Sequence, residues 1–105
     1  MNEGNDMDIV REIKDAIASG DVTIGSRTTL GACSRGEVSL VLLAANCPAD
    51  MVNDLVSKHP EVVLHQLNIV NRDLGTACGK PFSVATVGIR DAGSSELLTL
   101  EGNLT

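Results

Sequence analysis

The sequence predicts a three-layer α/β/α sandwich with a small four-stranded mixed sheet. Segments with helical periodicity alternate with short β-branched or apolar runs along the whole chain, and glycine or proline separates most of them. Alternation of this kind places helices on both faces of one sheet. The chain has 105 residues, enough for one buried core. We expect residues 1–5 to be a disordered tail and residues 6–105 to form a single domain.

Each element follows from its local pattern. The predicted helices cover about residues 8–19, 26–36, 48–58 and 71–78, and the predicted strands cover residues 22–24, 38–45, 62–67 and 83–89. Residues 95–100 form a short terminal helix or strand. The apolar run 38–45 is expected to be a central strand buried on both faces. The predicted N-caps are Asp6 or Asp8, Ser26, Asn46 or Cys47, and Asn71. The predicted buried face of the third helix is Met51, Val52, Leu55 and Val56.

Composition limits the possible functions. No apolar run approaches the length that spans a bilayer, and the acidic start is unlike a secretory signal, so we expect a cytoplasmic protein. The cysteines at 33, 47 and 78 are odd in number and match no zinc spacing, which predicts free thiols and no metal site. The net charge of −6 argues against nonspecific binding of nucleic acid.

Positive charge is nevertheless concentrated in two blocks. Residues 22–47 hold two arginines and one glutamate, and residues 71–90 hold three cations and one aspartate. If the fold brings these blocks together, a basic patch lies on an acidic body. Loops at strand ends are where sites form in such sheets, and helix N-termini favour anions. The candidate loops are Gly25-Ser26-Arg27-Thr28, Ala45-Asn46-Cys47-Pro48, and Asn71 through Phe82, the last of which holds Leu74, Gly75 and Lys80.

Neither nucleotide-binding glycine fingerprint is present, so we expect no cofactor. One hypothesis is that the stretch from Leu74 to Phe82 is part of an RNA-binding edge, since Lys80 supplies a compact positive charge and Phe82 a flat face on which a base can stack. The alternative is an ordinary helix-to-strand connection with Phe82 in the core, which the residues alone favour because most single phenylalanines are buried.

Three further motifs join the Leu74–Lys80 stretch in order along the chain. They are Gly25-Ser26-Arg27-Thr28-Thr29-Leu30, Ala44-Ala45-Asn46-Cys47-Pro48 and Asp91-Ala92-Gly93-Ser94-Ser95. Together these motifs resemble the large-subunit ribosomal protein family L-thirty-e of archaea and eukaryotes. That family belongs with the L-seven-Ae-type proteins that bind kink-turns, sharply bent internal loops of RNA. The resemblance covers roughly residues 9–100 and implies a non-enzymatic α/β/α protein of the cytoplasmic ribosome.

The resemblance also implies roles for these loops. Gly25, Ser26, Arg27 and Thr28 would begin the helix that enters the kinked groove, and Asn46 would hydrogen-bond a base or sugar edge. Leu74, Gly75 and Lys80 would line the other wall, with Phe82 stacking on or packing beneath an extruded nucleotide. The implied partners are ribosomal RNA and neighbouring ribosomal proteins, not DNA or a membrane.

The chain departs from the family in two ways. It lacks the tyrosine pair that relatives carry late in the third helix, and it is acidic where most relatives are basic. Other functions remain open on the residues alone. One is a kink-turn protein of another ribonucleoprotein particle, one is a small-molecule or thiol enzyme using Cys47 or Cys78, and one is an adaptor that binds a partner through the acidic first helix.

Overall fold

The computed structural model describes residues 8–104, so the tail predicted at residues 1–5 lies outside the described part. The elements in chain order are α1 (Ile9–Ser19), β1 (Asp21–Ile24), α2 (Ser26–Ser34), β2 (Leu40–Leu43), α3 (Ala49–Lys58), β3 (Val63–Gln66), α4 (Asn71–Ala77), β4 (Thr86–Asp91) and a short 3₁₀ helix η2 (Leu97–Thr99). No helix between residues 8 and 104 is long and apolar enough to cross a membrane.

The four strands form one mixed sheet, as predicted, and their order is β1-β4-β2-β3. Strands β2 and β3 pair in parallel, whereas β4 runs antiparallel to both β1 and β2. The three strands β1, β2 and β3 therefore point in the same direction. Their carboxyl ends and the beginning of β4 meet at one end of the sheet, which positions the candidate loops together.

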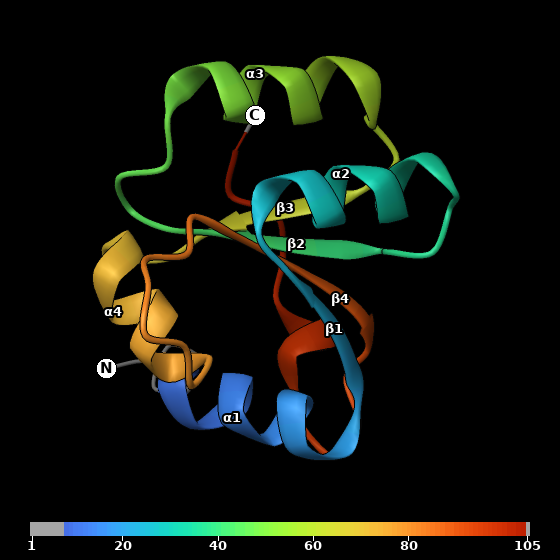
Figure 1. The fold of residues 1–105 in the computed structure, drawn as a ribbon. Coiled ribbons are helices and arrows are strands. Elements are labelled where there is room, and N and C mark those ends of the chain that lie inside the picture. Colours follow the sequence, from blue (N-terminus) through green and yellow to red (C-terminus); the bar gives the residue numbers. More distant parts are fainter. Residues whose placement is uncertain (1–7, 105) are drawn as a thin grey trace.

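Helices cover both faces of this sheet, which confirms the three-layer prediction. Helices α2 and α3 lie on one face and α1 and α4 on the other (Figure 1). The side chains of β2 alternate between the two layers, since Leu40 and Leu42 pack in the α1/α4 core and Val41 and Leu43 in the α2/α3 core. All four are buried, which confirms that β2 is a central strand enclosed on both faces.

Several local predictions are confirmed and others need correction. Asp8 caps α1, its side chain accepting a hydrogen bond from the Arg11 N–H. Strand β4 begins at Thr86 and not at residue 83, because residues 79–85 form a long connection that runs back along α4. Val56 was expected in the core but is 46% exposed, since α3 turns only Met51, Val52 and Leu55 toward the sheet.

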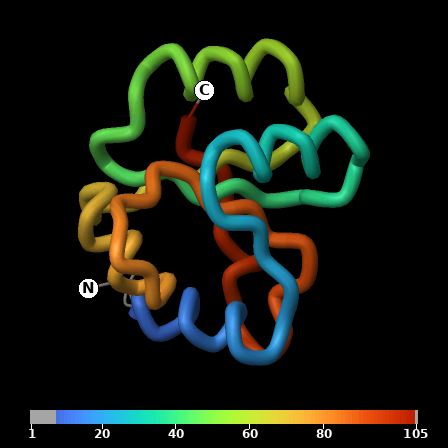
Figure 2. Tube along the Cα trace, in the orientation of Figure 1, coloured from blue at the N-terminus to red at the C-terminus, as the bar shows by residue number. Residues whose placement is uncertain are grey.

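The chain's last described residues run along the outer edge of β3. The Asn103 N–H donates to the Leu64 carbonyl, and the Asn103 side chain bonds both backbone groups of Gln66. Figure 2 shows this red segment rising past β3 toward α3. Backbone groups that an edge strand would leave unpaired are thereby satisfied.

Candidate nucleic-acid interface

The loops at the carboxyl ends of β1 and β2 are tied to one another and to the start of β4 by backbone hydrogen bonds. The Gly25 N–H donates to the Thr86 carbonyl at 2.9 Å, and the Ala44 N–H donates to the Ala85 carbonyl at 2.9 Å. The Ala45 N–H donates to the Ile69 carbonyl at 2.7 Å, which joins the loop after β3. We call this surface the loop end; it comprises Gly25 to Thr28, residues 44–48, residues 67–71 and residues 79–85.

The first wall of the loop end is the beginning of α2. Gly25 occupies the N-cap position with φ +102°, a conformation that favours glycine, and it turns the chain sharply from β1 into α2. Ser26 was predicted to be the cap, which is wrong. Its hydroxyl instead lies 3.2 Å from the Thr86 hydroxyl of β4. Arg27 and Thr28 are exposed beside the positive end of the α2 dipole, where an anion is favoured.

The second wall is the loop at Asn46, which joins α4. Asn46 or Cys47 was predicted to cap α3, which is wrong, because Pro48 holds that N-cap position and no side chain caps α3. The Asn46 Oδ1 accepts the Asn71 N–H at 2.8 Å, and its Nδ2 donates to the Asn71 Oδ1 at 3.2 Å. Asn71 is accordingly the first residue of α4 and not its cap. These two bonds fix the orientation of an exposed amide at the loop end.

The third wall is the end of α4 with the connection that follows it. Leu74 is completely buried, so its side chain supports the wall from inside. Gly75 is also buried, and a Cβ there would overlap the Phe82 carbonyl oxygen. The Lys80 N–H donates to the Gly75 carbonyl at 2.9 Å, which folds the connection back on the helix. Phe82 is 58% exposed, so the expectation that it packs in the core is wrong.

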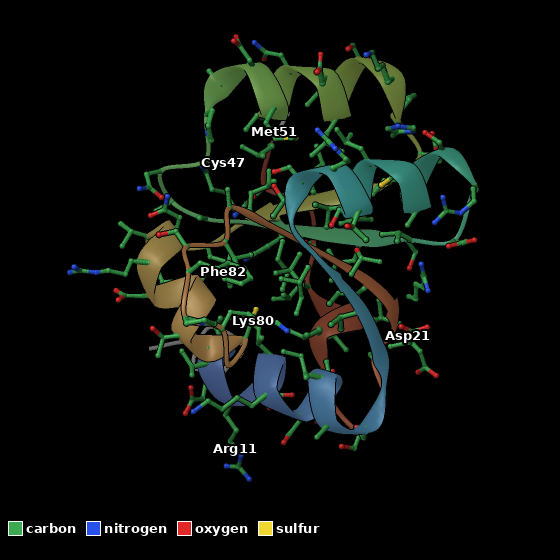
Figure 3. The ribbon with its side chains drawn as sticks, in the orientation of Figure 1. Arg11, Asp21, Cys47, Met51, Lys80 and Phe82 are labelled. Carbon is green, nitrogen blue, oxygen red and sulfur yellow. The ribbon has the colours of Figure 1, made fainter. Side chains whose placement is uncertain are left out.

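A hollow of about 230 Å³ lies beside the exposed aromatic ring. Its lining consists of Arg72, Thr76, Lys80, Pro81, Phe82 and Ser83, and we call it the Lys80 hollow. Figure 3 places Lys80 and Phe82 along the same connection, next to α4. The hollow thus combines two cations with a flat apolar face.

The sequence reasoning did not assign site roles to Arg72, Thr76 or Thr86. Arg72 and Thr76 fall within the candidate loop Asn71 to Phe82 but were given no role of their own. Thr76 lies four residues after Arg72, on the same face of α4. Nothing in the sequence singles out Thr86, because its position beside Ser26 depends on the pairing of β1 with β4.

The three thiols are not activated. Burial raises the pKa of Cys47, and the Thr86 hydroxyl opposes that shift only in part. Burial likewise raises the pKa of Cys33 and Cys78. A nucleophilic cysteine needs a lowered pKa, so this chemistry does not support a thiol enzyme. Residues 8–104 also contain no cluster of three His, Cys, Asp or Glu side chains that could hold a metal ion.

The loop end therefore presents cationic side chains, a fixed amide, a helix N-terminus and an exposed aromatic ring. Arg27, Lys80 and the α2 dipole suit phosphate groups, and Phe82 suits a nucleobase. These features belong to a small α/β/α domain whose loop end has the chemistry that suits single-stranded or distorted nucleic acid.

The chain belongs to the Ribosomal protein L7Ae/L30e/S12e/Gadd45 family, whose model matches residues 7–99. The family resemblance inferred from the motifs is thus confirmed. The chain is 35% identical to the large ribosomal subunit protein eL30 of Methanocaldococcus jannaschii over 102 residues, covering 95% of this chain and 93% of that protein. It is 38% identical to the eL30 protein of Methanobrevibacter smithii over 97 residues, covering 88% and 95% of the two chains.

A solved structure shares the fold. A protein of unknown function from Bacillus halodurans C superposes with a TM-score of 0.75, covering 88% of this chain and 93% of that one. The two chains are 22% identical, so the likeness concerns the fold alone.

Proposed function

We propose that this protein is a non-catalytic component of the large ribosomal subunit that binds a kink-turn-like internal loop of ribosomal RNA through its loop end. The observation that carries the proposal is the exposure of Phe82 between Lys80 and the other loops. A chain without Trp or Tyr leaves its single aromatic ring largely in solvent. Burial of that ring would stabilise the fold, so its exposure favours a role in binding.

Each wall has its own task in this proposal. Arg27 and the N-terminus of α2, with Gly25, Ser26 and Thr28, hold phosphates in the kinked groove. Asn46 offers its remaining donor to a base or sugar edge, while its other bonds hold the amide still. Lys80 contacts the backbone of the opposite strand, and Phe82 stacks on an extruded base. Leu74 and Gly75 keep α4 and the Phe82 connection in place.

Because the chain is acidic overall, its binding of RNA depends more on shape and base stacking than on phosphate contacts. Phosphate contacts are few on this surface, and salt weakens each of them. Selectivity for a bent RNA over a straight one then comes from the three walls that surround the bend. Neighbouring ribosomal proteins and ribosomal RNA are the expected partners in the cytoplasm, and co-sedimentation with large ribosomal subunits tests that placement.

Binding to a kink-turn RNA and to a straight duplex of the same length tests the proposed function directly. We expect tight binding to the kink-turn alone; equal affinities for the two RNAs would rule out the proposal. Arg27→Ala should weaken kink-turn binding about 5- to 100-fold, as for loss of a charge-assisted bond. Lys58→Ala is the matched control, because it removes one exposed cation at the far end of α3.

Phe82→Leu separates stacking from packing. Because the ring is largely exposed, we expect the thermal midpoint to stay within a few degrees of the parent while RNA affinity falls about 5- to 150-fold. A variant that loses stability but keeps its RNA affinity would show that Phe82 is a structural residue.

A further inference from the structure

A second hollow lies beyond the loop end, along the seam between α1 and α4. Its volume is about 380 Å³, and its lining comes from two elements: Lys14, Ile17 and Ala18 on α1, and residues 76–79 at the end of α4. Thr76 lines both this hollow and the Lys80 hollow. The two depressions therefore adjoin at Thr76, and we call the surface that runs from the Lys80 hollow to α1 the α1–α4 seam.

The charges along the α1–α4 seam are of one sign. Lys14, Arg72 and Lys80 are exposed, and none of them forms an ion pair with any residue from 8 to 104. Neither hollow has a carboxylate in its lining. In a chain with net charge −6, the charged side chains that line these two hollows are therefore all cations, which favours a negatively charged ligand there.

Lys80 lines the Lys80 hollow and directly follows Cys78 and Gly79, which line the second hollow. Figure 3 shows Lys80 between Phe82 and helix α1. Its ammonium group is close enough to Cys78, which lines the second hollow, to oppose the rise that burial causes in the pKa of that thiol. A strand that follows the two hollows away from the aromatic ring therefore passes Lys80 and then Lys14.

We propose that the α1–α4 seam is a second RNA contact that binds the sugar–phosphate backbone of the strand leaving the kink. This proposal rests on the proposed function, since the strand reaches the seam only when the bend occupies the loop end. Lys14 and Arg72 pair with phosphates, and the apolar wall of Ile17, Ala18 and Ala77 contacts the ribose faces. Beyond Phe82, the residues that line the seam include no aromatic ring and no side-chain amide, so that part of the seam reads no base and adds affinity without sequence preference.

Salt titrations on two RNAs test the seam separately from the loop end. One RNA is the kink-turn with minimal flanking stems, and the other has both stems extended by one helical turn. Each backbone phosphate that a lysine neutralises contributes about 0.7 to 0.9 to the slope of log K against log salt concentration. Lys14→Ala should therefore reduce the steepness of this salt dependence by about 1 and weaken binding several-fold for the extended RNA. The same variant should leave binding of the minimal RNA unchanged. Lys58→Ala, which removes the same charge on α3, should change neither RNA's binding.

A gain of affinity gives an independent readout. Ala18 is an exposed helix residue in the seam, so Ala18→Lys should tighten binding of the extended RNA and Ala18→Glu should weaken it, with the fold intact by circular dichroism. Unchanged slopes for Lys14→Ala and unchanged affinities for both Ala18 variants would overturn the seam while leaving the loop end in place. Failure of the parent protein to prefer the minimal kink-turn over a duplex would instead overturn the proposed function, and the seam with it.

Discussion

Gly75 of α4 lies directly against the backbone of Phe82, so that a Cβ at Gly75 would overlap the Phe82 carbonyl oxygen. A backbone oxygen cannot rotate away as a flexible side chain can. The Gly75 carbonyl also accepts the Lys80 N–H at 2.9 Å. Gly75 therefore sets how closely the connection follows α4, and with it the position of the exposed ring.

Gly75→Ala should for this reason disturb both fold and site. The added methyl group forces α4 and the connection apart, which we expect to cost about 1–3 kcal/mol of unfolding free energy and to weaken kink-turn binding. Gly31→Ala is the matched control on α2, because its Cβ meets only the movable end of Arg35. That variant should be neutral or slightly stabilising. Urea unfolding of both variants checks the difference, and equal midpoints would contradict it.

A buried pair of hydroxyl groups joins β1 to α2. The Oγ1 atoms of Thr23 and Thr29 lie 2.9 Å apart, and both side chains are buried. Thr29→Val leaves the Thr23 hydroxyl without its partner, which should cost about 1–3 kcal/mol. The double variant Thr23→Val/Thr29→Val removes both groups and should be less destabilised than the sum of the single changes. Additive losses in denaturant unfolding would show that the bond contributes nothing.

The Asn103 side chain takes the place of a neighbouring strand at Gln66. Its Oδ1 accepts the Gln66 N–H at 2.7 Å, and its Nδ2 donates to the Gln66 carbonyl at 3.0 Å. Asn103→Ala should cost about 1 kcal/mol and speed hydrogen exchange at the Gln66 amide. Asn68→Ala, at an exposed asparagine whose side chain forms no hydrogen bond with residues 8–104, should change neither quantity. Unaltered exchange at Gln66 would mean that the tail does not protect the edge of β3.

The buried thiols predict a loss of stability at alkaline pH. Burial raises the pKa of Cys33, Cys47 and Cys78 above that of an unfolded thiol, about 8.5. The contribution of these thiols to the free energy of unfolding is fully present below the unfolded pKa and is lost as pH rises through the folded pKa. The reason is that the thiols of the unfolded chain ionise at a lower pH than those of the folded protein. The urea concentration at the midpoint of unfolding should therefore decrease as the pH is raised from neutral through this range.

Alkylation by iodoacetamide measures the reactivity of the same three thiols directly. At neutral pH the native protein should react far more slowly than the urea-unfolded chain, since the thiolate is the reactive form. One thiol that reacts fast in the native protein would contradict the inactivity of the cysteines and restore the enzyme hypothesis.

Much of the fold could be predicted from residue patterns. The two-sided burial of β2 follows from the apolar run at residues 38–45, and the Asp8 cap follows from an acidic residue before a periodic helix. The loops of the candidate site were also located, because glycine, asparagine and cations occur together there. Pattern reasoning failed where two segments compete for one side chain. Asn46 could cap α3 next to it in sequence, but it binds Asn71, 25 residues away.

The sequence by itself determined the α/β/α class, the family and the three loops, because periodicity, turn residues and short motifs are local properties. Only the tertiary structure decided what each loop residue does. The antiparallel placement of β4 between β1 and β2 brings Thr86 to Ser26, and the contact of Gly75 with the Phe82 backbone holds the ring outside the core. Those relations depend on which strands pair and how closely helices pack, and such long-range contacts are not encoded in any single stretch of the chain.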